Sequence, residues 1–192
     1  MGRRLHDEDD RALVARASAG DRRALDVLLD RHADRIHAVC RRVVGNADDA
    51  LDATQEAMIA VARGIGRFDG RAAFTTWIYR IATNAALDEL RRRSRRPQPR
   101  ETLPEPTAAA TPLDDRVGAR LDIDAALALV PEDFRVAVVL RDLCDLDYAE
   151  IAAVLDVPPG TVRSRIARGR AALAHVLGNQ DTGGDRPTER TR

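Results

Sequence analysis

The segment 147–170 carries the side chains best suited to reading a nucleic acid. It reads as two short helices joined by a tight turn at 156–160, where two prolines and Gly160 interrupt the helical pattern. One face of the second helix carries small and basic side chains: Arg163, Ser164, Ala167 and Arg168. Arginine can bind guanine through two hydrogen bonds and serine can bind several bases. This spacing therefore predicts a helix-turn-helix whose second helix enters a DNA major groove.

The remaining residues of these two helices fit the same interpretation. Asp147 and Glu150 have the spacing of a capping box at the start of the first helix. The inward face of the second helix would be apolar: Val162, Ile166 and Leu173. Its other polar side chains are placed to contact phosphates, which position a helix without specifying sequence: Thr161, Arg165 and Arg170. The alternative is a solvated basic helix that binds nothing.

A second polar stripe lies upstream, with steps of four, four and three residues: Arg80, Asn84, Asp88 and Arg91. It runs into the segment 91–96, in which five of six residues are arginine. Phe68 and Trp77 precede the stripe, and an aromatic-flanked basic helix can bind single-stranded nucleic acid. The competing interpretation places Trp77 in the core and treats 91–96 as a solvated helix end.

No combination of residues indicates an enzyme. His32, His37 and Cys40 share one expected helix, but a metal site needs more ligands and a supporting shell. We find no phosphate loop, nucleophile motif or paired carboxylates. The sequence therefore predicts no catalytic residues, no metal, no cofactor and no small-molecule substrate. Cys40 and Cys144 are far apart and form no CxxC pair, so we expect two buried, reduced thiols.

Composition favours an all-α fold. The chain has 192 residues, enough for one or two domains, and 44% of them are apolar although only 3% are aromatic. Such cores must be built from Ala, Leu, Val and Ile, which suits packed helices. No apolar run is long enough to span a bilayer and no signal-peptide pattern opens the chain, so we expect a cytoplasmic protein without membrane insertion.

Charge is segregated along a chain whose formal net charge is zero. Arginine dominates 91–96, whereas acidic residues outnumber basic ones between 101 and 156. Every basic side chain apart from histidine is arginine, and there is no lysine. Because local fields steer a polyanion, the neutral total does not exclude a nucleic-acid partner.

The periodicity predicts two small helical domains. The first, 1–96, would contain helices at about 7–19, 21–44, 47–63 and 73–93, with a loop at 64–70. Asp21 would cap the second of these helices, Gly45 would end it, and Asn46 with Asp49 would cap the third. The third of these helices would turn four side chains inward: Leu51, Met58, Ile59 and Ala62. The segment 97–115 holds five prolines and several acids, which is typical of a linker.

The second domain would span 116–178, and 179–192 reads as a disordered polar tail. Its first helix would carry Leu121, Ala125, Leu127 and Leu129. Its second would start at Pro131 and carry Phe134, Val138 and Leu140. The helix-turn-helix completes the domain.

Several of these segments resemble one known family. The stretch 68–93, FDGRAAFTTWIYRIATNAALDELRRR, resembles region 2 of the extracytoplasmic-function sigma factors. The segment 52–56, DATQE, resembles the polymerase-binding helix of that family. The stretch 129–141, LVPEDFRVAVVLR, and the helix-turn-helix resemble its region 4. The likeness covers roughly residues 10–178 in the family's order.

The resemblance implies a dissociable subunit of bacterial RNA polymerase whose first domain binds the core enzyme and opens the −10 element, while the second reads the −35 element as duplex. By position, the −10 site comprises Phe68 and Asn84 for base capture and Arg80, Arg91, Arg92 and Arg93 for the strand and its phosphates. The residues that the family uses on −35 bases correspond to Arg163, Ser164 and Arg168. Some relatives carry a larger residue at the position of Ala167, so the −35 preference can differ.

The resemblance also assigns partners. Asp52, Gln55 and Glu56 fall on the polymerase-facing helix. Promoter DNA and an anti-sigma factor are the other expected partners, and a stress or envelope-response regulon is the expected target. One alternative is a helix-turn-helix regulator that binds duplex DNA independently of polymerase. Another is a helical adaptor whose arginines bind acidic protein surfaces.

Overall fold

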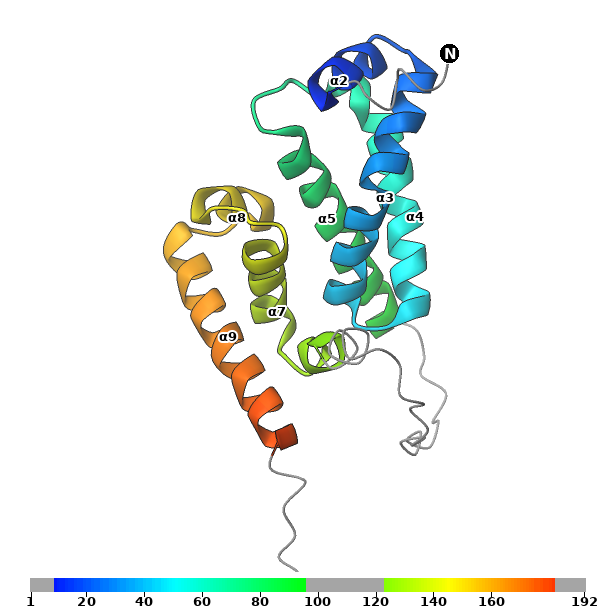
Figure 1. The fold of residues 1–192 in the computed structure, drawn as a ribbon. Coiled ribbons are helices and arrows are strands. Elements are labelled where there is room, and N and C mark those ends of the chain that lie inside the picture. Colours follow the sequence, from blue (N-terminus) through cyan, green and yellow to red (C-terminus); the bar gives the residue numbers. More distant parts are fainter. Residues whose placement is uncertain (1–8, 96–122, 182–192) are drawn as a thin grey trace, which may run out of the picture.

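The computed structural model describes residues 9–95 and 123–181, in which every regular element is a helix. The helices form two groups that lie side by side (Figure 1). The first group contains α2 (Asp10–Ser18), α3 (Arg22–Val44), α4 (Ala47–Gly64), the short η1 (Ile65–Arg67) and α5 (Phe74–Arg95). The prediction of an all-α fold is confirmed for these residues. The expected linker 97–115 and the residues up to 122 lie outside the described part of the chain.

The helix ends of the first group follow the predicted capping residues. Asp21 begins α3 by accepting hydrogen bonds from the backbone of Arg23 and Ala24 at 3.0 and 3.2 Å. Gly45 ends it with a left-handed φ of 83°, a conformation that glycine adopts without strain. Asn46 then accepts a bond from the backbone of Asp49 at 2.9 Å and begins α4. These three ends fix where α3 and α4 turn back on each other.

The inward face of α4 differs from the prediction. Leu51 is 57% exposed and Ile59 is 42% exposed. The buried side chains of α4 are instead small: Ala50, Ala53, Ala57 and Val61. Alanine lets helix backbones approach closely, so α4 packs through this seam against α3 and α5 and leaves Leu51 and Ile59 outside. Met58 and Ala62, also predicted inward, are partly buried.

The second group is built around the predicted helix-turn-helix. Residues 123–128 are helical and lead to α7 (Glu132–Val138), the π-helical segment η2 (Val139–Leu143), α8 (Tyr148–Leu155) and α9 (Pro159–Asp181). Leu129, expected on the helix, lies in the turn before α7 and is 70% exposed. Ala126 and Leu127 fill the core in its place. α9 reaches Asp181, and the rest of the expected tail lies outside the described residues.

The turn of the helix-turn-helix uses a different residue from the one expected. The capping box is present, with Asp147 and Glu150 bonded reciprocally at 2.8 and 2.9 Å. The left-handed residue, however, is Asp156, with φ 53°. Pro159 begins α9, because proline has the φ that a first helical turn needs. Gly160 therefore lies inside the first turn of α9 and not in the bend.

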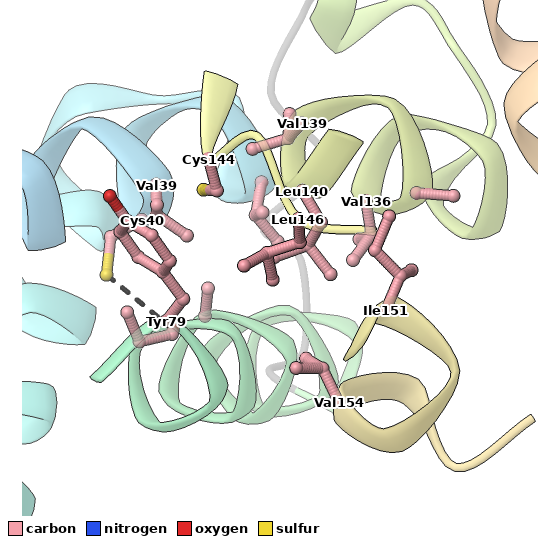
Figure 2. Close-up of a cluster of buried hydrophobic side chains, with 14 of the residues drawn as sticks. Val39, Cys40, Tyr79, Val136, Val139, Leu140, Cys144, Leu146, Ile151 and Val154 are labelled. Carbon is pink, nitrogen blue, oxygen red and sulfur yellow. Dashed lines mark hydrogen bonds between the residues drawn. The ribbon is translucent and has the colours of Figure 1, made fainter. Parts of the chain in front are cut away.

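One continuous apolar core joins the two groups. Val39 and Tyr79 come from α3 and α5, and they meet Leu140, Leu146 and Cys144 from the second group (Figure 2). The first helix of the helix-turn-helix adds to the same core its buried side chains: Ile151, Ala152 and Val154. The helix-turn-helix thus packs on α5 as well as on its own recognition helix.

Polar contacts reinforce this interface. The Thr76 hydroxyl of α5 donates to Glu150 Oε1 at 2.8 Å, so one carboxylate caps α8 and holds α5. Asp124 accepts from Arg41 at 2.9 Å and pairs with Arg42 at 3.1 Å. The two predicted DNA-binding units are therefore in direct contact in this structure.

Because α9 lies so close to α7, a larger side chain at the point of contact should destabilise the fold. A Cβ added at Gly169 would lie 2.5 Å from Val138 Cγ2 and 2.8 Å from the Phe134 carbonyl oxygen. We expect Gly169→Ala to destabilise the chain by about 1–3 kcal/mol, as overpacking does. Gly178→Ala is the matched control in the same helix, because nothing lies within 4 Å of its Cβ position. Urea unfolding measures both, and an unchanged midpoint for Gly169→Ala would contradict the packing.

Candidate nucleic-acid interface

α9 presents the predicted polar face to solvent. Arg163, Ser164, Ala167 and Arg168 are exposed. Val162 and Ile166 are buried on the opposite side, and Leu173 packs partly buried against the core. The Ser164 hydroxyl donates to the Thr161 carbonyl at 2.9 Å and keeps its oxygen lone pairs outward. The arrangement matches a helix that reads base edges with its N-terminal half.

The arginines expected on phosphates are ion-paired. Arg165 lies 3.0 Å from Asp133. Arg170 donates from Nε to Asp142 at 3.1 Å, and this hydrogen bond raises the pKa of Arg170. Thr161 is partly buried at the start of the helix. Carboxylates of the α7–η2 segment thus occupy, in the free chain, the donors that a phosphate would use.

The arginines expected on bases have different neighbours. The guanidinium carbon of Arg163 lies 5.7 Å from the ring centroid of Tyr148. That of Arg168 lies 5.8 Å from the ring centroid of Phe134. Sequence reasoning gave these aromatic residues no role at the interface. The capping box could have drawn attention to Tyr148, since it makes Tyr148 the first residue of α8. The contact of Phe134 depends on tertiary packing alone.

A surface pocket of about 580 Å³ lies between α2, the loop after η1 and the start of α5. Phe68, Phe74, Val14 and Asp10 line it, among others. The ring centroids of Phe68 and Phe74 are 5.8 Å apart, nearly perpendicular. Trp77 packs against Phe68 with ring centroids 5.2 Å apart and ring planes tilted by 51°, and it is partly buried, as a core residue would be. A pocket with aromatic walls and a polar rim suits an unstacked base.

The α2 wall of this pocket is held by a buried histidine. His32 is 1% exposed, and its Nε2 lies 2.8 Å from Asp10 Oδ2. Its ring meets Phe74 edge-on at 5.4 Å. Partial burial of Asp10 would raise the pKa of its carboxyl, but hydrogen bonds from Arg31 and His32 outweigh burial and lower it. The ionised carboxylate of Asp10 thus links α2, which forms one wall of the pocket, to Arg31 and His32.

The polar stripe of α5 is exposed along its length, at Arg80, Asn84, Asp88 and Arg91. Asn84 does not line the pocket that contains Phe68. Of the two residues that the resemblance assigns to base capture, Phe68 thus lines the pocket, and Asn84 lies outside that lining on the exposed side of α5. Three arginines at the end of the helix are ion-paired: Arg91 with Asp88 at 2.8 Å, Arg92 with Glu89 at 3.0 Å, and Arg93 with Asp49 at 3.6 Å.

The outer face of α4 combines charge with exposed apolar surface. Asp52, Gln55 and Glu56 are all exposed. Leu51 and Ile59, expected in the core, lie exposed beside them. Exposed apolar side chains with a polar rim are typical of a protein-binding surface. The signal that could have found them is the seam of small residues, which must take the inward side of α4.

Burial disfavours the thiolate form of both cysteines. It raises the pKa of Cys40 to about 11 and that of Cys144 to about 12. Within residues 9–95 and 123–181 no group of His, Cys, Asp and Glu could hold a metal ion. No helix in the same two stretches is long and apolar enough to cross a membrane.

Family models match both groups of helices. A model described as Sigma-70 region 2 matches residues 28–96, and one described as Sigma-70, region 4 matches residues 120–173. The ECF RNA polymerase sigma factor SigM of Mycobacterium tuberculosis (strain H37Rv) is 39% identical over 181 residues, covering 93% of this chain and 89% of SigM. The RNA polymerase sigma-H factor of Pseudomonas aeruginosa is 38% identical over 185 residues, covering 90% and 96%.

Solved structures show the same fold. CnrH, solved in complex with the cytosolic domain of CnrY, matches with a TM-score of 0.65 at 27% identity, covering 88% of this chain and 97% of CnrH. The sigma factor RpoE of Bartonella quintana, solved with the anti-sigma factor NepR, matches with a TM-score of 0.62 at 22% identity. That second match covers 82% of this chain and 96% of RpoE, and it shows the fold alone.

The ion pair between Arg170 and Asp142 predicts a measurable restraint on DNA binding. We expect Asp142→Asn to tighten binding to a duplex without promoter sequence by about two- to five-fold, because Arg170 becomes available to one more phosphate. The slope of log binding constant against log salt concentration should become steeper by up to about 0.9. Fluorescence anisotropy across a KCl series measures both. Asp145→Asn removes a nearby exposed charge, and no ion pair in the described residues joins Asp145 to an arginine. Equal gains in both variants would contradict the restraint.

Proposed function

The chain belongs to the extracytoplasmic-function sigma factors of the sigma-70 family, and we propose that it directs core RNA polymerase to promoters by binding duplex −35 DNA through α9 and melted −10 DNA through the first helical group. One observation carries this proposal: the chain has two separate surfaces suited to nucleic acid, one in each sigma region. A reader of duplex DNA alone needs only the second.

The −35 element is the ligand that we propose for α9. Arg163, Ser164 and Arg168 would contact base edges, since they are exposed near the helix N-terminus. Thr161 and Arg165 would contact phosphates and set the register of the helix. The small side chain of Ala167 leaves room at the groove floor for a base or its methyl group.

The −10 element is the proposed ligand of the pocket and of α5. The aromatic pocket that includes Phe68 supports capture of a base flipped out of the stack. Asn84 would read a base edge from the exposed face of α5. The neighbouring arginines would hold the separated strand through its phosphates: Arg80, Arg91, Arg92 and Arg93. Base capture and strand holding together favour the melted over the paired state.

Core polymerase is the proposed partner of the outer face of α4. Asp52, Gln55 and Glu56 offer two carboxylates and an amide, and Leu51 and Ile59 add apolar area. Rim charges steer association, while desolvated apolar side chains contribute most of the affinity. This face also argues against a regulator that works without polymerase, because such a protein has no use for it.

We further propose that the chain works in the cytoplasm, performs no catalysis itself, and is held by an anti-sigma factor when idle. The complex of CnrH with the cytosolic domain of CnrY supports a protein partner of this kind. The matched residues 28–96 and 120–173 also support division of the chain into domains at 1–96 and 116–178. The segment 97–115 would then be a linker, and the residues after Asp181, where α9 ends, would be a tail.

The two DNA-binding units must separate for this function. Elements centred 10 and 35 base pairs upstream of the start lie about 85 Å apart along B-DNA, at 3.4 Å per base pair. A compact chain of 192 residues has a radius of gyration of only about 16 Å. The contact between α5 and α8 therefore describes a resting state, which the binding of polymerase would open.

Reconstitution tests the proposed function. The full chain added to core RNA polymerase should produce discrete run-off transcripts from fragmented genomic DNA of its source bacterium. The absence of any specific transcript would defeat the proposal.

We expect Asn84→Ala to reduce permanganate-detected melting at the −10 element at least ten-fold, while duplex binding by the holoenzyme changes little. Equal losses of melting and duplex binding would exclude a base-specific role for Asn84.

The two thiols report domain separation and provide their own control. Cys144 lies at the interface between the groups, whereas Cys40 lies inside the first group, with its sulfur 3.7 Å from the Ala82 carbonyl. We expect iodoacetamide at pH 8 to alkylate Cys144 at least ten times faster in the holoenzyme than in the free chain. Opening exposes Cys144 and returns its pKa toward the ordinary value of about 8.5. Mass spectrometry should find the Cys40 rate unchanged, and protection of Cys144 in the holoenzyme would contradict separation.

A further inference from the structure

The four arginines on the DNA-facing side of the second group fall into two classes by what they touch. Arg165 and Arg170, the phosphate-side arginines, pair with aspartates. Arg163 and Arg168, the base-side arginines, lie over aromatic rings at 5.7 and 5.8 Å. No ion pair joins either base-side arginine to a carboxylate within the described part of the chain.

This difference matters because of the shape of a guanidinium group. Its five N–H donors point outward in the plane of the group, so a carboxylate that pairs with it occupies the same edge that would bind guanine. An aromatic ring contacts the flat face and leaves the donors in the plane free. A ring can therefore restrict the orientation of an arginine without using the hydrogen bonds that recognise a base.

We propose that Tyr148 and Phe134 are positioning residues for sequence readout, which hold Arg163 and Arg168 over their rings so that each presents its donor edge to a guanine in the major groove. The proposal rests on the proposed binding of −35 DNA by α9 and deepens it. Two bidentate arginines predict that the recognised duplex contains two guanines, each placed opposite one of them. A mobile arginine would lose more rotamer freedom on binding than one already restricted by a ring.

Tyr148, although 38% exposed, has contacts at its backbone and at its ring. Tyr148 follows the N-cap residue Asp147, and the reciprocal bonds of Asp147 and Glu150 set the first turn of α8. Arg141 lies 5.5 Å from the same ring centroid. The Nη1 of Arg141 donates to the Leu146 carbonyl at 2.7 Å, which anchors this second cation. The helix cap thus sets the backbone of Tyr148, and an arginine that is already bonded lies against its ring.

The Phe134 ring is placed by the contact between α7 and α9. The absence of a side chain at Gly169 allows α9 to approach the backbone of Phe134, where a Cβ would lie 2.8 Å from the carbonyl oxygen. Arg168 precedes this glycine, so its guanidinium reaches the ring directly. Close packing at Gly169 and readout by Arg168 are therefore consequences of one helix contact.

A double-mutant cycle on Tyr148 and Arg163 tests the proposal. The full chain, bound to core RNA polymerase, is equilibrated with a library of duplexes that carry a randomised segment long enough for both promoter elements, and the retained duplexes are sequenced. We expect Tyr148→Leu to reduce the preference for one guanine of the −35 element by about two- to five-fold, the factor that corresponds to a cation–π contact at an exposed site. In an Arg163→Ala background, Tyr148→Leu should change that preference no further.

The control variants separate positioning from other roles. Tyr148→Phe keeps the ring and should keep the preference, whereas a loss in this variant would assign the effect to the hydroxyl and overturn the proposal. Phe134→Leu should weaken a second guanine position, and only while Arg168 is present. Retention of duplexes that lack the preferred sequence should stay constant, which a general loss of folding would not allow.

The outcomes distinguish this inference from the proposed function. A wild-type holoenzyme that selects no sequence would overturn both. A wild-type holoenzyme that selects a −35 sequence, together with a Tyr148→Leu holoenzyme that selects it equally well, would overturn only the positioning roles. Equal effects of Tyr148→Leu with and without the Arg163→Ala substitution would do the same, because the ring would then act independently of the arginine.

Discussion

The apolar contact between the first helix of the helix-turn-helix and α5 is the interaction on which the rest of this structure depends. Ile151 and Val154 are buried in a core that includes residues of α3 and α5. Each such side chain contributes about 1.5–3 kcal/mol on full burial, so a few of them approach the roughly 5–15 kcal/mol that stabilises a whole domain. Opening the contact, as proposed for the binding of polymerase, would cost only part of this free energy, because Ile151 and Val154 also pack against side chains of the second group.

The same contact explains which parts of the fold could be predicted from the sequence. Caps, stripes and turns are local, and Asp21, Gly45 and the Asp147–Glu150 box lie where their residue types predicted. The partner of a helix face is not local. Leu51 and Ile59 were expected inward because leucine and isoleucine usually are, yet the alanine seam of α4 permits closer packing. The prediction for Leu129 was wrong for a related reason. Pro131 cannot continue the helix, which ends at residue 128, before Leu129.

The candidate site divides in the same way. The exposed face of α9 followed directly from period and composition, because a surface needs no partner to be specified. The neighbours of its arginines did not follow, since Tyr148, Phe134, Asp133 and Asp142 reach α9 only through tertiary packing. Asn84 lies on the exposed side of α5 and Phe68 lines the pocket, so the base-capture roles transferred to them by position stay predictions.

Pairing of arginines with aspartates also accounts for a DNA-binding chain with zero net charge. An exposed, unpaired arginine cluster binds any polyanion, and non-specific sites outnumber promoters by orders of magnitude. Aspartates on Arg165 and Arg170 would lower that background, whereas rings beside Arg163 and Arg168 would leave their donors available for base recognition. Two DNA contacts of modest affinity, joined by a linker, bind more tightly together than separately because each raises the effective concentration of the other. This gain in affinity requires that both contacts form at once. In this structure α5 and α8 are in contact, so in the proposed mechanism the gain in affinity is absent until polymerase separates the two DNA-binding units. Specificity therefore depends on the opened chain more than on the affinity of either unit.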